Sequence, residues 1–187
     1  MGKKHVFNTG KNLPKARYND YLELREKRDN LVKHPIMKQS RRDGSVIYGA
    51  HALNRLLGRG YQRSTYDYDV YSKTSKRHAT EIEQSIDRGT NSDLAFVEKT
   101  FYPHGKKMRP LYRVKLRDDT VEADFNSMPS DISFVTRDNG VRYETLKRAR
   151  DKYKRMNTTM GVDRTGYGEL DRIRTYNIIK NRRNRFR

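Results

Sequence analysis

The stretch that decides the fold lies at residues 67–71, which read Asp-Tyr-Asp-Val-Tyr. Side chains of an extended strand point alternately to its two faces, so this alternation predicts a β-strand. The same period of two places the carboxylates of Asp67 and Asp69 on one face. The strand therefore carries two acids side by side.

Helix signals flank this strand on both sides. Residues 45–48 predict a short apolar strand that runs into Gly49, and residues 50–57 are rich in good helix formers. Residues 75–87 predict a second helix, because their apolar members recur at the spacing of one helix face.

Three further strand signals follow, at residues 93–98, 111–116 and 120–125. Residues 117–119 form the turn between the last two. This alternation of strands and helices predicts an α/β core over residues 45–136.

The core is flanked by two basic segments. Residues 1–44, 45–136 and 137–187 carry net charges of +7, +2 and +10, within a total of +19. We expect a basic N-terminal arm and helix, a nearly neutral core and a basic C-terminal helical extension. The N-terminal helix is expected over residues 18–32, ended by Pro35. The C-terminal helices are expected over residues 143–156 and 168–183, joined by a linker.

Composition excludes several classes of site and points to a class of partner. The chain has no Cys, so it can hold neither a disulfide framework, nor a thiolate nucleophile, nor a Cys-ligated metal site. No apolar run approaches the roughly 18 residues that a membrane span needs. We expect a cytoplasmic, virion-associated or nucleoid-associated protein.

The basic flanks favour nucleic acid, RNA or DNA, as partner, because cations gain affinity for phosphate chains by releasing condensed counterions. A membrane is not favoured, since no apolar face with basic flanks is visible. The bland alternative is a solvated, soluble surface, although +19 exceeds the net charge of about 2 to 8 typical of small domains.

A third acid, Asp124, lies on a later predicted strand, in addition to Asp67 and Asp69. Carboxylate oxygens suit Mg²⁺ or Mn²⁺, and three acids on neighbouring strands could hold two ions about 3.5 to 4 Å apart. Gly49 offers a turn at a helix N-terminus where backbone N–H groups could approach a phosphate. Taken singly, each element has a simpler interpretation: a polar strand face, a solvated rim residue and a tight connection.

The order and spacing of these elements resemble the signature of the DNA polymerase beta-like nucleotidyltransferase superfamily. The resemblance covers about residues 45–126 and rests on three segments: Ile47-Tyr48-Gly49-Ala50, then Arg63-Ser64-Thr65-Tyr66-Asp67-Tyr68-Asp69-Val70-Tyr71, then Glu122-Ala123-Asp124-Phe125. It implies a mixed sheet with helices on one face. It also implies transfer of a nucleoside monophosphate from an NTP substrate, with Mg²⁺ or Mn²⁺ as cofactor.

The resemblance implies a role for each matching residue. Asp67 and Asp69 would bind both metal ions, and Asp124 would bind the catalytic ion and help to deprotonate the acceptor hydroxyl. Gly49 and Ala50 would line the triphosphate, Thr65 matches the threonine before the acidic pair, and Arg63 would meet phosphate or pair with a carboxylate. Ala50 departs from the pattern, since the superfamily usually has Gly or Ser there.

These residues support a metal-dependent nucleotidyltransferase whose acceptor is a nucleic acid. The alternative is a nucleic-acid-binding or virion structural protein that keeps the fold without turnover. A protein or small-molecule acceptor is a third possibility, and a protein partner could take part.

Three other features have open interpretations. Tyr66, Tyr68 and Tyr71 are expected in the core, with base stacking as the alternative. His51 and His78 are expected at the surface or as helix caps. The basic stretch at residues 102–107 either grips phosphate or is a solvated hairpin connection.

Overall fold

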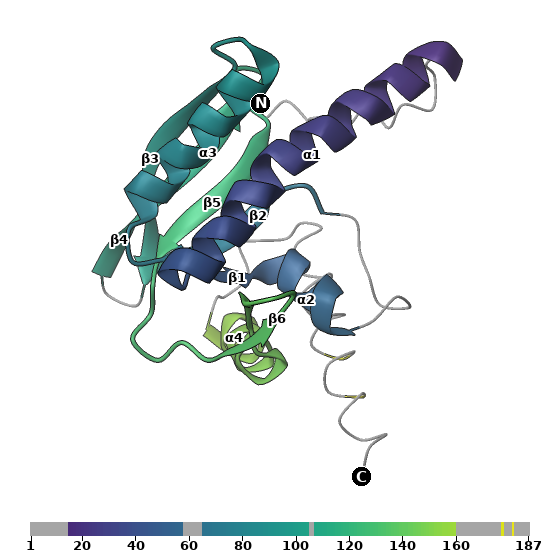
Figure 1. Cartoon of the computed structure of the whole chain (residues 1–187). Helices are drawn as coiled ribbons and strands as arrows, with labels where there is room; N and C mark the ends of the chain where they lie inside the picture. The colour runs from purple at the N-terminus through teal and green to yellow at the C-terminus, as the bar shows by residue number, and fades with distance from the viewer. Residues whose placement is uncertain (1–14, 58–64, 105–106, 160–176, 178–180, 182–187) are drawn as a thin grey trace, which may run out of the picture.

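The computed structural model describes residues 15–57, 65–104 and 107–159, together with positions 177 and 181. Four helices and seven strands make up the described residues (Figure 1). In chain order they are α1 (Lys15–Asp43), β1 (Val46–Tyr48), α2 (Gly49–Leu57), β2 (Tyr68–Ser72), α3 (Ser75–Thr90), β3 (Ala95–His104), β4 (Lys107–Leu116), β5 (Val121–Ser127), β6 (Phe134–Arg137), β7 (Val141–Glu144) and α4 (Leu146–Thr159).

The strands form one mixed sheet in the order β3-β4-β5-β2-β1-β7-β6. β2 pairs parallel with β5, and β1 pairs parallel with β7, while the other neighbours are antiparallel. The predicted α/β class with a mixed sheet is therefore confirmed. The sheet places β5 directly beside β2, although 48 residues separate the end of β2 at Ser72 from the start of β5 at Val121.

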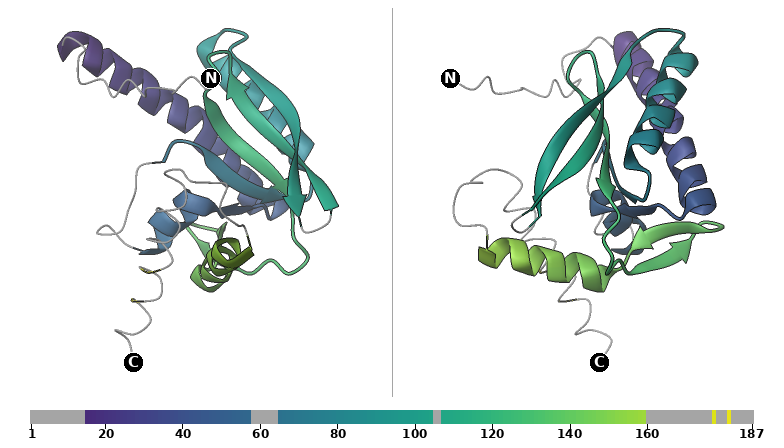
Figure 2. Two further views of the ribbon diagram at one scale, coloured as in Figure 1. Left: turned by 180° about the vertical axis from the view of Figure 1, so that it is seen from behind. Right: turned by 90° about the vertical axis from the view of Figure 1, so that its left-hand side faces the viewer.

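Helices α1 and α3 cover one face of the sheet (Figure 2, right). The strand residues that alternate toward these helices form the apolar core. Phe125 and Val70 are fully buried there against Ile82 and Ile86 of α3 and Ile36 of α1. The period-two and helical patterns of the sequence thus converge on one apolar layer.

Helix α1 is longer than expected, because it continues through Pro35 to Asp43. Ile36 and Ser40, both beyond the proline, are fully buried. The Ser40 hydroxyl donates to the Ser45 carbonyl oxygen at 2.7 Å and accepts from the Arg142 N–H at 2.8 Å. Packing of this last part of the helix against the sheet outweighs the local cost of the proline.

Strands β6 and β7 were not expected, and the helix expected from residue 143 begins at Leu146 instead. A turn at residues 138–140, with positive φ at all three positions, joins the two strands. β7 then pairs with β1, Ile47 lying opposite Tyr143. The sheet therefore extends beyond residue 136, where the sequence analysis placed the end of the core.

Two other expectations fall partly or wholly on residues that are not described. The helix expected over 168–183 lies outside the described residues except at positions 177 and 181. The basic stretch at 102–107 is mostly strand, because β3 extends to His104 and β4 begins at Lys107, while residues 105 and 106 are not described. None of the described helices is long and apolar enough to cross a bilayer.

Candidate active site

Two of the three predicted acids are cross-strand neighbours. Asp69 of β2 lies opposite Asp124 of β5 in the parallel pair. Neighbouring strands are about 4.8 Å apart and paired residues share a face, so both carboxylates lie on the face opposite α1 and α3. Asp67 precedes β2 by one residue, and its charge acts on both Asp69 and Arg113. The structure therefore brings Asp69 and Asp124 together on the sheet, and Asp67 lies close enough for its charge to act on Asp69.

Gly49, the first residue of α2, lies against the side chain of Asp69. Its φ is +67°, and a Cβ atom at this position would lie 2.1 Å from Oδ2 of Asp69. Only glycine combines this backbone conformation with so close an approach. Ala50 is 4% exposed, so its methyl group faces the interior of the protein.

The carboxyl group of Asp69 is strongly perturbed. Burial raises its pKa to about 7, and the negative charges of Asp67 and Asp124 act in the same direction. The Lys152 ammonium and a hydrogen bond from the Tyr48 hydroxyl oppose this shift. A cation placed between these acids would favour the charged carboxylate, because opposite charge lowers a carboxyl pKa.

Asp124 already has a cationic partner, which the sequence did not reveal. Nε and Nη2 of Arg113 on β4 donate to the two carboxylate oxygens of Asp124, each at 2.8 Å. This ion pair raises the pKa of the Arg113 guanidinium. Within the described part of the chain, no group of three or more His, Cys, Asp and Glu side chains is arranged to hold a metal ion.

The acids nevertheless have the chemistry that a divalent cation requires. Asp67 and Asp69 supply hard oxygen donors and an excess of negative charge at a partly buried place. Asp124 could join them only where Arg113 releases it. The predicted Mg²⁺ or Mn²⁺ site thus stays a prediction, with Asp67 and Asp69 as its first ligands.

Thr65 supports the acidic pair, since its hydroxyl donates to Oδ1 of Asp67 at 3.3 Å. This contact gives the threonine of the motif a role in orienting a carboxylate. Arg63, the other residue expected near phosphate, lies outside the described residues.

An aromatic and cationic group adjoins the acids, and the sequence analysis did not predict that its members lie together. The rings of Tyr48 and Tyr71 stack with centroids 3.9 Å apart. Asn126 donates to the Tyr48 hydroxyl at 2.6 Å. Nζ of Lys152 on α4 lies 4.5 Å from the Tyr48 ring centroid and 3.0 Å from Oε2 of Glu144. No periodicity marks Lys152, because it belongs to a helix that is basic along its length.

The expected core tyrosines divide between three environments. Tyr68 is 4% exposed and lies in the core, whereas Tyr66 is 46% exposed. Tyr71 lies on the face that carries the acids. The core expectation is therefore confirmed for Tyr68 alone.

The expectation of surface or capping histidines is wrong for His78. Its side chain is 1% exposed and lies 2.7 Å from Oδ2 of Asp43 through Nε2. Nδ1 lies 2.8 Å from the Ser72 hydroxyl. The partners come from α1 and β2, so the sequence around His78 could not reveal them. His51 stacks on Tyr68 with centroids 3.7 Å apart.

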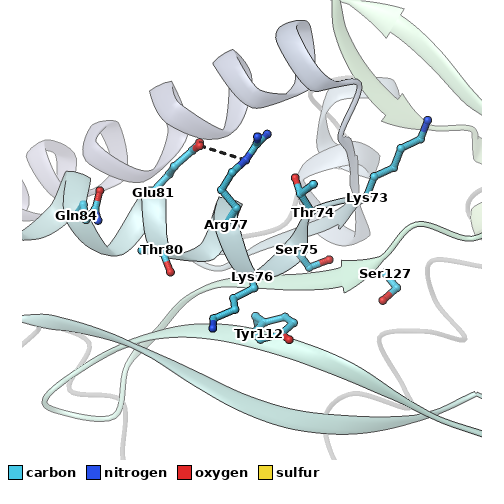
Figure 3. A pocket seen from close by; sticks show the side chains of 10 residues that line it. All are labelled: Lys73, Thr74, Ser75, Lys76, Arg77, Thr80, Glu81, Gln84, Tyr112 and Ser127. Carbon is cyan, nitrogen blue, oxygen red and sulfur yellow. Dashed lines mark ion pairs between the residues drawn. The ribbon is translucent and has the colours of Figure 1, made fainter.

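A hollow of about 640 Å³ lies elsewhere on the molecule, between the start of α3 and β4 (Figure 3). Lys73, Lys76 and Tyr112 are among the residues that line it, and none of the three predicted acids does. Tyr112 neighbours Arg113 on β4 but faces the core side. The hollow is therefore separate from the three acids, which lie on the opposite face of the sheet. We take the acids, rather than the hollow, as the candidate active site.

Sequence comparison gives no relatives: no family model matches the chain, and neither does any curated protein. Comparison of structures does give matches. The Megavirus polyadenylate synthase matches 97% of this chain and 39% of its own, with a TM-score of 0.54 and 18% identity. JHP933 from Helicobacter pylori matches 79% of this chain and 63% of its own, with a TM-score of 0.47 and 17% identity. The antibiotic-resistance factor ANT(2'')-Ia matches 82% and 83%, with a TM-score of 0.46 and 14% identity.

The match to the polyadenylate synthase establishes a likeness of fold. The chain has the nucleotidyltransferase fold that its motifs resemble, and it spans about two fifths of that enzyme's length.

Proposed function

We propose that this protein is a metal-dependent nucleotidyltransferase that moves a nucleoside monophosphate from an NTP to a hydroxyl group of a nucleic acid. The observation that carries the proposal is the register of β2 and β5, which sets Asp69 opposite Asp124 beside Gly49. Folding alone gives no reason to place two acids, 55 positions apart in the chain, opposite each other beside Gly49, since like charges in contact are destabilising.

Each residue has a place in the reaction. Asp67 and Asp69 would hold Mg²⁺ or Mn²⁺, which lowers the pKa of an attacking hydroxyl and stabilises charge on the leaving pyrophosphate. Asp124 takes the proton of the acceptor hydroxyl. The acceptor oxygen bonds to the α-phosphorus as the bond to pyrophosphate breaks. Gly49, with no side chain, leaves room for the triphosphate beside Asp69, and Ala50 would contribute its backbone.

The proposed acceptor follows from charge. The segments 1–44 and 137–187 carry +7 and +10, which favours a polyanion. One solved structure with a similar fold is that of the Megavirus polyadenylate synthase. Both observations favour a nucleic acid over a small molecule as acceptor.

The test is transfer of label from each α-³²P NTP to RNA or DNA oligonucleotides, in Mg²⁺ or in Mn²⁺. We expect incorporation by the wild type and none by an Asp67→Asn/Asp69→Asn variant. Asp93→Asn is the matched control, because Asp93 is an exposed carboxylate whose partner, Arg117, is also exposed. Equal incorporation by the acidic-pair variant would remove the catalytic proposal.

Two observations favour a second candidate, a nucleic-acid-binding protein without turnover. The Arg113–Asp124 ion pair occupies the third acid, and Ala50 lacks the hydroxyl that the superfamily often has there. Binding of oligonucleotides that weakens with NaCl, without transfer in either metal, would favour this candidate. Label that appears in protein of a cell extract would instead favour a protein acceptor.

A further inference from the structure

The face that carries the acids has a row of four charged side chains across four strands. Glu98 of β3 lies opposite Arg113 of β4, Arg113 lies opposite Asp124 of β5, and Asp124 lies opposite Asp69 of β2. Paired residues share a face of the sheet, so these four side chains are consecutive neighbours.

Arg113 stands between two carboxylates in this row. It makes the two-pronged pair with Asp124, whose side chain is 14% exposed, and it also feels the charge of Glu98. Glu98 is 44% exposed, and its ion pair with Nζ of Lys115 is long, at 3.9 Å. Glu98 therefore offers a second carboxylate within one strand of the guanidinium.

The pair with Arg113 conflicts with the role proposed for Asp124. A carboxylate that accepts two parallel N–H bonds has its strongest acceptor sites occupied, and a guanidinium does not lose its charge by deprotonation. Asp124 cannot act fully as a metal ligand or a base while Arg113 holds both of its oxygens. Release of Arg113 is thus a requirement of the proposed chemistry.

We propose that Arg113 is a latch residue: it holds Asp124 before a divalent cation enters, and it moves to Glu98 when Asp124 turns to the cation. This inference rests on the proposed function and adds a positioning residue to it. The latch offsets repulsion between Asp124 and Asp69 in the metal-free protein, and competition with Arg113 weakens cation binding.

The test measures Mn²⁺ binding directly, by electron paramagnetic resonance of the free ion, with the full chain and no nucleotide. We expect Arg113→Gln to bind Mn²⁺ about tenfold more tightly than the wild type, a difference of about 1.4 kcal/mol, since the charged hydrogen-bonded pair no longer competes. Arg113→Lys keeps the charge without the planar fork and should lie between the two. Glu98→Gln removes the second partner and should bind Mn²⁺ a few-fold more weakly.

The matched control is Arg109→Gln, which removes the same charge from the same face of β4. Residue 109 is four positions from residue 113, about 13 Å along a strand, and a distance beyond about 8 Å is largely screened at physiological salt. We expect less than a twofold change for this variant. Thermal unfolding of each variant checks that it is folded, and Arg113→Lys serves if Arg113→Gln does not fold.

The outcomes separate the latch from the function on which it rests. Mn²⁺ binding that is lost in Asp69→Asn but unchanged in Arg113→Gln and Arg113→Lys would overturn the latch alone. Equal tightening by Arg109→Gln would also overturn it, because general charge would then explain the effect. No Mn²⁺ binding by any form would overturn both the latch and the metal-dependent transfer.

Discussion

Asp124 and Phe125 are consecutive residues of β5, yet they belong to two different kinds of surface. Phe125 points into a layer that α1 and α3 close, and it is fully buried. Asp124 points to the other face, into a row of charged groups that includes a second acid directly opposite. Burial of apolar area accounts for the first face without any appeal to function.

The second face needs a different explanation. Asp69 is held where burial and neighbouring acids raise its pKa to about 7. Such an arrangement costs stability, and proteins retain costly polar groups mainly at functional sites. In β5, the odd-numbered residues thus pack in the apolar core, whereas the even-numbered residues lie on the face of the candidate site.

The largest effect is expected from replacing Asp69, the acid at the centre of the site, which tests whether this face serves activity rather than stability. We expect Asp69→Asn to lower nucleotide transfer about 10³-fold or more, the scale of losing one preorganised electrostatic group. Its thermal unfolding temperature at pH 8 should not fall, because the neutral amide avoids the cost of burying a charge. Transfer assays and calorimetry on the same preparation check both expectations, and a large fall in melting temperature would place Asp69 among the residues of the fold.

The opposite behaviour is expected of Phe125. Phe125→Ala should lower the free energy of unfolding by about 3 to 5 kcal/mol, because a fully buried aromatic ring leaves a cavity. Urea denaturation measures this change. Phe125→Leu, which keeps most of the volume, should lose less. A mild effect of the alanine variant would show that the helix-covered face is not the main core.

Gly49, at the start of α2, tests how closely the backbone must approach the acids. In Gly49→Ala the new methyl group would meet Oδ2 of Asp69, so we expect transfer to fall about 100-fold, the scale of a displacement of about 1 Å at a site. Positive φ adds a cost of order 1 to 3 kcal/mol in stability. Gly140→Ala is the control, since Gly140 also has positive φ but its Cβ would make only an ordinary contact, at 3.5 Å. Equal loss of transfer in both variants would mean that backbone strain, rather than the contact, matters.

The smallest effect is expected from His78, a polar group on the helix-covered side. Burial lowers the pKa of His78, although Asp43 and Glu81 oppose the shift and Arg77 supports it. The unfolded chain therefore binds a proton first as the pH falls below about 6.5, and stability should decline from there downward. Thermal unfolding between pH 7.5 and 5.5 measures the slope. His78→Asn should flatten it, whereas His34→Asn, at an exposed position, should not.

The sequence could predict the parts of the site that lie within single strands. The two-residue period of a strand predicted that Asp67 and Asp69 share a face. The apolar spacing of α3 predicted the packing face of this helix, on which Ile82 and Ile86 are buried. The convergence of Asp124 with Asp69 came from the resemblance of the motif order, and the register of β2 and β5 bears that convergence out.

Other parts depend on pairings between distant segments. The contact of Arg113 with Asp124 requires both the strand order and the register, neither of which local spacing determines. β7 is only four residues long and is stabilised by pairing with β1 far away in the sequence. The continuation of α1 through Pro35 similarly depends on tertiary burial, which outweighs a local helix-breaking preference.

The shortest strand of the sheet has the most demanding position. β1 has three residues, and it joins the block β3-β4-β5-β2 to the block β7-β6. The two blocks are therefore joined through only three residues of β1, and Gly49 follows directly as the first residue of α2. The narrowest junction of the sheet thus lies directly beside the residue that approaches Asp69, so a change at Gly49 acts where the two blocks meet.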